Sequence, residues 1–169
     1  MNKREVEAKA TKMLRDHGML DMVVDPVRLA NASGLRIYNA KFGDENVHGL
    51  VAVRGGKAKV YVNADASPVR KRFTIAHELG HFHLHLAGGE GEFIDDADTF
   101  RIPVEPDAAW TPERRREWEA NVFAAALLMN EDLVRRKWPE IQDIEGMARW
   151  FQVSQHAMAI RLDELGLAA

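Results

Sequence analysis

Residues 77–81 read His-Glu-Leu-Gly-His, and side chains in this order could bind a metal ion and hydrolyse a peptide bond. Two histidines four positions apart lie on one face of a helix, about one turn from each other, so both imidazoles can reach one tetrahedral zinc ion. A glutamate beside the first histidine can hold the metal-bound water and accept its proton. The pattern therefore predicts His77 and His81 as metal ligands and Glu78 as the general base of a zinc peptidase.

The residues around this motif favour a buried helix. Ser67 and Pro68 are a typical N-cap and first helical residue, and the segment that follows Arg72 is largely apolar. Polar groups that are buried on such a helix need partners, and a metal ion would satisfy them. The alternative is a surface helix whose histidines only face water.

A catalytic zinc ion usually has three protein ligands and keeps one position for water or substrate. His85 shares a face with the two histidines but lies about 12 Å along the helix from His77, so we interpret it as a hydrogen-bonding neighbour. The chain has no cysteine, which leaves a carboxylate from another helix. Glu117, on the apolar stripe of a helix expected over 111–129, is the best candidate. Glu119, about 200° around the same helix, is the second choice.

Composition sets limits on the class of protein. With 169 residues, of which 46% are hydrophobic, the chain has the length and composition of one globular domain. The net charge of -3 gives no general attraction to nucleic acid or to anionic membranes. The N-terminus is charged and no apolar run approaches the length of about 20 residues that spans a bilayer, so we expect a cytoplasmic protein with no membrane contact.

Periodicity predicts an α+β fold. Helices are expected over 3–17 and 25–34, followed by strands over 35–39, 48–54 and 57–63, with Gly55 and Gly56 as the hairpin turn. This predicts a small antiparallel three-stranded sheet before the motif helix. An irregular segment follows from 88 to 111 and would border the active site. Further helices are expected over 131–137, 141–151 and 155–165.

Two features of this sheet could serve catalysis. An extended substrate could add as a strand to an exposed sheet edge, for which the run 57–63 is the candidate, although an ordinary strand fits it equally well. Tyr61 or His48 could stabilise the oxyanion, but a structural role is favoured for both.

Two segments together resemble the ImmA/IrrE family of zinc metallopeptidases. They are Arg72-Phe-Thr-Ile-Ala-His-Glu-Leu-Gly-His81 and Glu117-x-x-Ala-Asn-x-Phe-Ala-x-x-Leu-Leu-Met129. The resemblance implies one zinc ion per chain on His77, His81 and Glu117, with Glu78 as general base. It also implies a single zincin-like domain over 1–169, with a catalytic core over 1–130 and a C-terminal helical subdomain over 131–169. Asn130 departs from the family, in which proline commonly follows this second segment.

The same resemblance implies a substrate. Family members look like regulatory proteases that cleave a helix-turn-helix repressor and so release stress-response, prophage or mobile-element genes. We expect no N-terminal helix-turn-helix domain here, so the repressor would be encoded separately. One alternative is a metal-dependent protein that sequesters its partner without cutting it. Another is DNA binding through the helices in 141–165. This segment has only two basic residues, Arg149 and Arg161, against four acidic ones, so direct nucleic-acid binding is not favoured.

Overall fold

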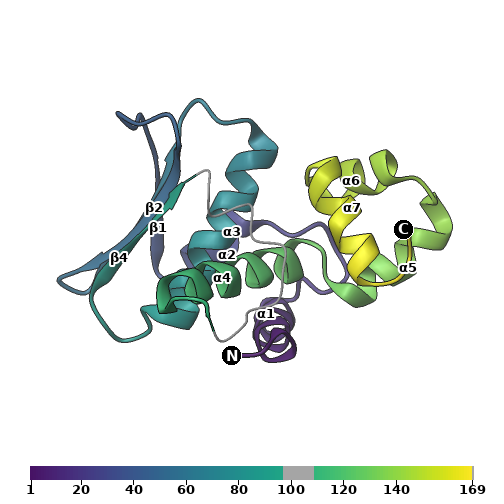
Figure 1. Cartoon of the computed structure of the whole chain (residues 1–169), viewed down its shortest axis with the longest axis horizontal. Helices are drawn as coiled ribbons and strands as arrows, with labels where there is room; N and C mark the ends of the chain where they lie inside the picture. The colour runs from purple at the N-terminus through teal and green to yellow at the C-terminus, as the bar shows by residue number, and fades with distance from the viewer. Residues whose placement is uncertain (97–108, 169) are drawn as a thin grey trace.

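The computed structural model of the chain describes residues 1–96 and 109–168, and these form seven α-helices and a four-stranded sheet (Figure 1). The helices are α1 (Lys3–Asp16), α2 (Pro26–Ala32), α3 (Pro68–His85), α4 (Pro112–Leu128), α5 (Glu131–Ile141), α6 (Ile144–Phe151) and α7 (Gln155–Glu164). The strands are β1 (Leu35–Ala40), β2 (Val47–Arg54), β3 (Lys57–Asn63) and β4 (Gly91–Asp96). The predicted α+β class is confirmed, and the predicted helices and first three strands form close to their expected limits.

The sheet differs from the prediction in two ways. Its strand order is β1-β3-β2-β4, with β1 parallel to β3 and the other pairs antiparallel, so it is a mixed sheet of four strands and the three-stranded antiparallel sheet is wrong. The Gly55-Gly56 turn, with φ of 56° and 73°, fixes β2 and β3 as a hairpin. Because β2 and β4 occupy the other side, β1 pairs with the free edge of β3.

Strand β4 was not expected, since it lies in the segment predicted to be irregular. It pairs with β2 from Gly91 opposite Val53 to Asp96 opposite Val47. The rest of the predicted irregular segment, 97–108, lies outside the described residues. The run 57–63 is β3, which lies between β1 and β2, so it cannot be the exposed edge that the sequence suggested.

Helix α3 packs against one face of the sheet, and the other helices lie on the same side (Figure 1). The Ser67 side chain accepts a hydrogen bond from the backbone N–H of Arg70, and Pro68 opens the helix, as predicted. Val51 and Val60 of the sheet and Leu79 of α3 are fully buried in the core. A central helix of this kind holds its side chains in fixed positions.

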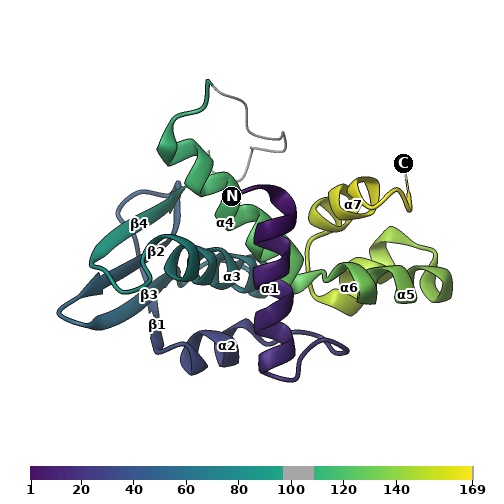
Figure 2. The same ribbon diagram turned by 90° about the horizontal axis from the view of Figure 1, so that it is seen from below.

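Helices α3 and α4 lie side by side at the centre of the molecule, and α1 packs against α4 (Figure 2). Gly80 permits the close approach of α3 to α4, because a Cβ atom there would lie 3.3 Å from the Cα of Ala120 and 3.1 Å from the Phe123 ring. The Thr111 hydroxyl caps α4 by accepting a hydrogen bond from Arg114. The two helices that carry the predicted site are thus in direct contact.

Candidate metal centre

The motif side chains on α3 are buried. His77 and Glu78 are 0% exposed and His81 is 1% exposed. Glu117 enters from the first turns of α4, and its side chain retains 14% exposure. The structure therefore brings together the two histidines and the carboxylate that were predicted as ligands. The histidines are shielded from solvent, and solvent reaches the site at Glu117.

Three atoms converge at this site. The Nε2 atoms of His77 and His81 lie 3.1 Å apart, and each is 3.2 Å from Oε2 of Glu117. Tetrahedral ligands at the zinc–nitrogen distance of about 2.0–2.1 Å are about 3.3 Å from one another. The three atoms thus have the chemistry and the spacing of three corners of a zinc site. Glu119, the second choice, turns away from these atoms and contacts His85.

Each of the two histidines has a partner at its other ring nitrogen. His77 Nδ1 lies 2.8 Å from Oδ1 of Asn121, and His81 Nδ1 lies 3.0 Å from Nδ1 of His85. His85 Nε2 in turn lies 2.8 Å from Oε2 of Glu119. If His77 and His81 donate at Nδ1, both present Nε2 lone pairs to the metal position. His85 is the hydrogen-bonding neighbour that the sequence predicted.

The tautomer of His85 follows from this chain of contacts. Burial lowers the pKa of His85, and this effect exceeds the opposing effect of the hydrogen bond to Glu119. A neutral His85 that donates from Nε2 to Glu119 leaves Nδ1 free to accept the proton of His81. Glu119 therefore orients the ligand His81 through His85, although it does not itself reach the metal position.

The ionisable groups of the centre are strongly coupled. Burial lowers the pKa of His77, but the charge of Asp95 and the hydrogen bond to Glu117 outweigh it and raise that pKa to about 9. Burial lowers the pKa of His81 to about 4 despite its hydrogen bond to Glu117. Burial raises the pKa of Glu117, but hydrogen bonds from both histidines reverse this and lower it to about 2. Without a metal, one positive charge on His77 thus compensates the Glu117 carboxylate.

Glu78 lies next to these ligands with neither carboxylate oxygen hydrogen-bonded to any residue that the structure describes. Burial raises its pKa well above the ordinary value; nearby Asp95 and Glu117 add to the rise, and His77 opposes it. A buried carboxylate whose oxygens remain available can accept a proton at this position.

Strand β4 adds two residues that sequence reasoning missed. The Phe93 ring stacks on His81 with centroids 4.2 Å apart, and buried Asp95 joins His77 and Glu78 in a second acidic cluster. The sequence carries no period-2 signal for this strand, because apolar Phe93 and Ile94 are adjacent and lie on opposite faces, Phe93 inward with Asp95 and Ile94 outward with Glu92.

Tyr61, one of the two residues considered for the oxyanion, lies away from the metal centre. Tyr61 stacks on Tyr38 at 5.6 Å between centroids. Its neighbours Val60 and Val62 face the core, so Tyr61 points to the opposite face of the sheet. His48 lies at an irregularity in the pairing of β2 with β4. A structural role remains the better interpretation of both.

Comparisons with known proteins agree with this site. The sequence profile of the family described as the IrrE N-terminal-like domain, a peptidase family, matches residues 30–163. Metallopeptidase ImmA of Bacillus subtilis (strain 168) is 23% identical over 133 residues, which cover 78% of this chain and 72% of that protein. A solved structure of a Mycobacterium tuberculosis transcriptional regulator superposes with a TM-score of 0.65 and 19% identity, covering 95% of this chain. This chain spans 46% of that protein, and the likeness concerns the fold alone.

Proposed function

Because the chain belongs to the peptidase family of the IrrE N-terminal-like domain, we propose that it is a zinc-dependent endopeptidase that cleaves a protein substrate. One zinc ion per chain would be held by His77, His81 and Glu117. The observation that carries this proposal is the convergence of His77 Nε2, His81 Nε2 and the Glu117 carboxylate at 3.1–3.2 Å. Two imidazoles and one carboxylate are a ligand set of known catalytic zinc sites.

When bound, zinc lowers the pKa of a coordinated water and polarises the scissile carbonyl. The remaining steps fall to side chains of this chain. Glu78 accepts the proton of the attacking water at its carboxylate and returns it to the leaving amine. Asn121 and His85 contact Nδ1 of the two imidazoles and so hold the rings with Nε2 directed at the metal position.

We further propose that an extended substrate runs beside β4. In the part of the chain that the structure describes, β4 is an edge strand, pairing with β2 alone, and it carries Phe93 and Asp95 next to the metal position. Addition of a peptide to this edge would supply main-chain hydrogen bonds independent of sequence. Strand β4 thus takes the place of the run 57–63 as the candidate for substrate pairing.

The proposed substrate is a separately encoded helix-turn-helix repressor. Its support is the resemblance to the ImmA/IrrE family, to which the relative Metallopeptidase ImmA also points. The alternative of DNA binding by α6 and α7 loses support, because Arg161 is 2% exposed and its guanidinium bonds Glu7 and the carbonyl of Met129. That leaves few cations on these helices for phosphate contacts. Among the described residues, no helix is long and apolar enough to cross a membrane.

Two measurements test this function. Elemental analysis of tag-free protein should give about one zinc per chain, lost when His77 or Glu117 is changed to Ala. Incubation with a repressor encoded by a neighbouring gene should give fragments that accumulate with time, with a single cut found by mass spectrometry. Stable complex formation without fragments would instead favour sequestration, and protein that takes up no zinc at neutral pH would contradict the proposed centre.

A further inference from the structure

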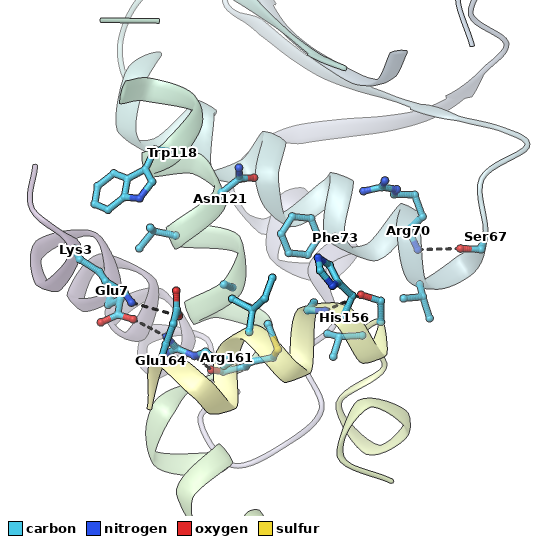
Figure 3. A pocket seen from close by; sticks show the side chains of 18 residues that line it. Lys3, Glu7, Ser67, Arg70, Phe73, Trp118, Asn121, His156, Arg161 and Glu164 are labelled. Carbon is cyan, nitrogen blue, oxygen red and sulfur yellow. Dashed lines mark hydrogen bonds and ion pairs between the residues drawn. The ribbon is translucent and has the colours of Figure 1, made fainter. Parts of the chain in front are cut away.

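A cavity of about 470 Å³ lies beside the metal centre, between α3, α4, α7 and the start of α1 (Figure 3). Cavities of this size are large enough for small ligands, and one of about 150 Å³ already accepts a benzene ring. Trp118 and Asn121 lie at the end away from Arg161 and Glu164 (Figure 3). The cavity therefore has room for a large side chain and part of a neighbouring one.

The wall of the cavity lies about one helical turn from the metal ligands on both α3 and α4. Phe73, in its wall, precedes His77 by four residues, and Asn121, also in its wall, follows Glu117 by four residues. Residues four apart lie on the same face of a helix, so the cavity and the metal ligands share one side of the α3–α4 pair. Asn121 joins them directly, since its Oδ1 is 2.8 Å from Nδ1 of His77.

The walls of the cavity combine polar residues, among them Arg70 and His156, with apolar side chains that supply most of the wall. The apolar side chains include Phe73, Trp118, Val122, Met129 and Ile160. The charged groups at the α1–α7 end are paired with one another: Glu7 with Arg161 at 2.7 Å, and Lys3 with Glu164 at 3.3 Å. Within each pair the two charges compensate each other, so this end of the cavity offers no unpaired charge to an ion and the cavity suits an apolar group better.

We infer that this cavity is the subsite that selects the substrate, by binding a large apolar side chain one or two residues from the scissile bond. The inference rests on the proposed peptidase function. One helical turn rises about 5.4 Å, and an extended peptide advances about 3.3 Å per residue, so a side chain one turn from the metal ligands belongs to a residue next to the cut or one beyond it.

Helix α7 thereby gains a role in specificity. Ala157 and Ile160 project from α7 into the wall of the cavity, and Ile160 is 38% exposed although it is a large apolar residue. A larger side chain at Ala157 would fill the space, whereas a smaller one at Ile160 would widen it. These two changes should shift the preferred substrate residue in opposite directions.

The first test is cleavage of a peptide library by zinc-loaded protein, with the residues around each cut identified by mass spectrometry. Wild-type protein should prefer large apolar residues at one position within two residues of the cut. Ala157→Phe should reduce that preference about tenfold in favour of small residues, and Ile160→Ala should favour bulkier ones. Gln155→Phe, an exposed position on the same helix outside the cavity, should match wild type. An unchanged preference in both folded cavity variants would overturn the inference and leave the peptidase function intact.

A second test decides the matter if the library is not cut. The chain has no cysteine, so Ala157→Cys introduces a single thiol in the cavity. Alkylation of this thiol by iodoacetamide, in a Glu78→Gln background, should slow at least threefold with millimolar acetyl-Leu-Leu-Leu-amide and not with acetyl-Ser-Ser-Ser-amide. The thiol of Gln155→Cys should react at the same rate with either peptide present. Protection without cleavage would support the subsite while the proposed activity fails, and equal rates at Ala157→Cys would overturn the subsite.

Discussion

Glu78 is the residue whose chemistry separates catalysis from metal binding. It is fully buried beside the ligands, and its oxygens make no hydrogen bond to the residues that the structure describes. Glu78→Gln keeps the size of the side chain but cannot accept a proton, so zinc content should stay near one per chain. The kcat/KM for cleavage should fall by a factor of about 10²–10⁴ or more. Glu140→Gln, an exposed change on α5, should match wild type in both measurements. Retained cleavage in Glu78→Gln would refute the assignment.

His77 makes zinc binding depend on pH. In the metal-free protein its pKa is raised to about 9, whereas the pKa of His81 is lowered to about 4. Between these values His77 holds a ring proton that must leave when the metal binds, so affinity should rise about tenfold per pH unit from pH 5 to 8. Calorimetric titration at pH 7 in buffers of different ionisation enthalpy should report at least one proton released, the one on His77. Binding without proton release would show that His77 is neutral before the metal arrives.

At the scale of elements, α3 and α4 are linked by the contacts from His81 through His85 to Glu119, 3.0 and 2.8 Å long. His85→Ala removes the acceptor that orients His81, so zinc affinity should fall about 10–100-fold in a chelator competition. His85→Gln should restore part of this loss, because its amide can both accept and donate. The matched control is His83→Ala, since His83 lies on the same helix but contacts Ser33. Equal affinity for His85→Ala and wild type would exclude a positioning role.

The packing of β2 on α3 sets the position of Glu78. A Cβ atom at Gly49 would lie 2.4 Å from Cγ2 of Thr74 and 3.2 Å from both Oε1 of Glu78 and the carbonyl oxygen of Tyr61. Gly49→Ala should therefore lower the free energy of unfolding by about 1–3 kcal/mol in urea denaturation. Gly43→Ala, where a Cβ atom meets nothing within 4 Å, should change stability little. A Gly49→Ala protein as stable as wild type would contradict this close contact.

How well each element could be predicted depended on the range of the interactions that form it. The spacing of His77 and His81 is set by helix geometry within one turn, so sequence alone was sufficient. The apolar stripe of α4 favoured Glu117, but Glu119 is also buried, at 5% exposure, so it is the contacts with His77 and His81 that separate the two glutamates. Strand β4 could not be predicted, because its one glycine and three acidic residues have low strand propensity and its order comes from pairing with β2. Likewise, the parallel pairing of β1 depends on which edge of β3 the hairpin leaves free.

At the scale of the whole molecule, the family profile over residues 30–163 confirms the resemblance to ImmA/IrrE metallopeptidases. The profile extends through α5, α6 and most of α7. Side-chain contacts join these helices to the rest: Arg161 of α7 bonds Glu7 of α1, and Arg72 of α3 bonds the carbonyl of Gln152. We propose that the predicted core over 1–130 and the helical subdomain over 131–169 unfold together as one domain. A calorimetric scan should then contain a single transition.

Zinc should stabilise that whole domain, because its ligands come from two central helices that pack on the sheet and on α1. A ligand present at 100 times its Kd stabilises the folded state by about 2.7 kcal/mol, which raises the Tm of a domain of this size by about 5–11 °C. Removal of the metal by a chelator should lower the Tm by that amount, and added zinc should restore it. The His81→Ala variant should show no response to either treatment. A chelator effect of equal size in His81→Ala would mean that the stabilising ion binds elsewhere. Two transitions, of which only one responds to zinc, would mean that α5–α7 unfold separately from the metal-binding core.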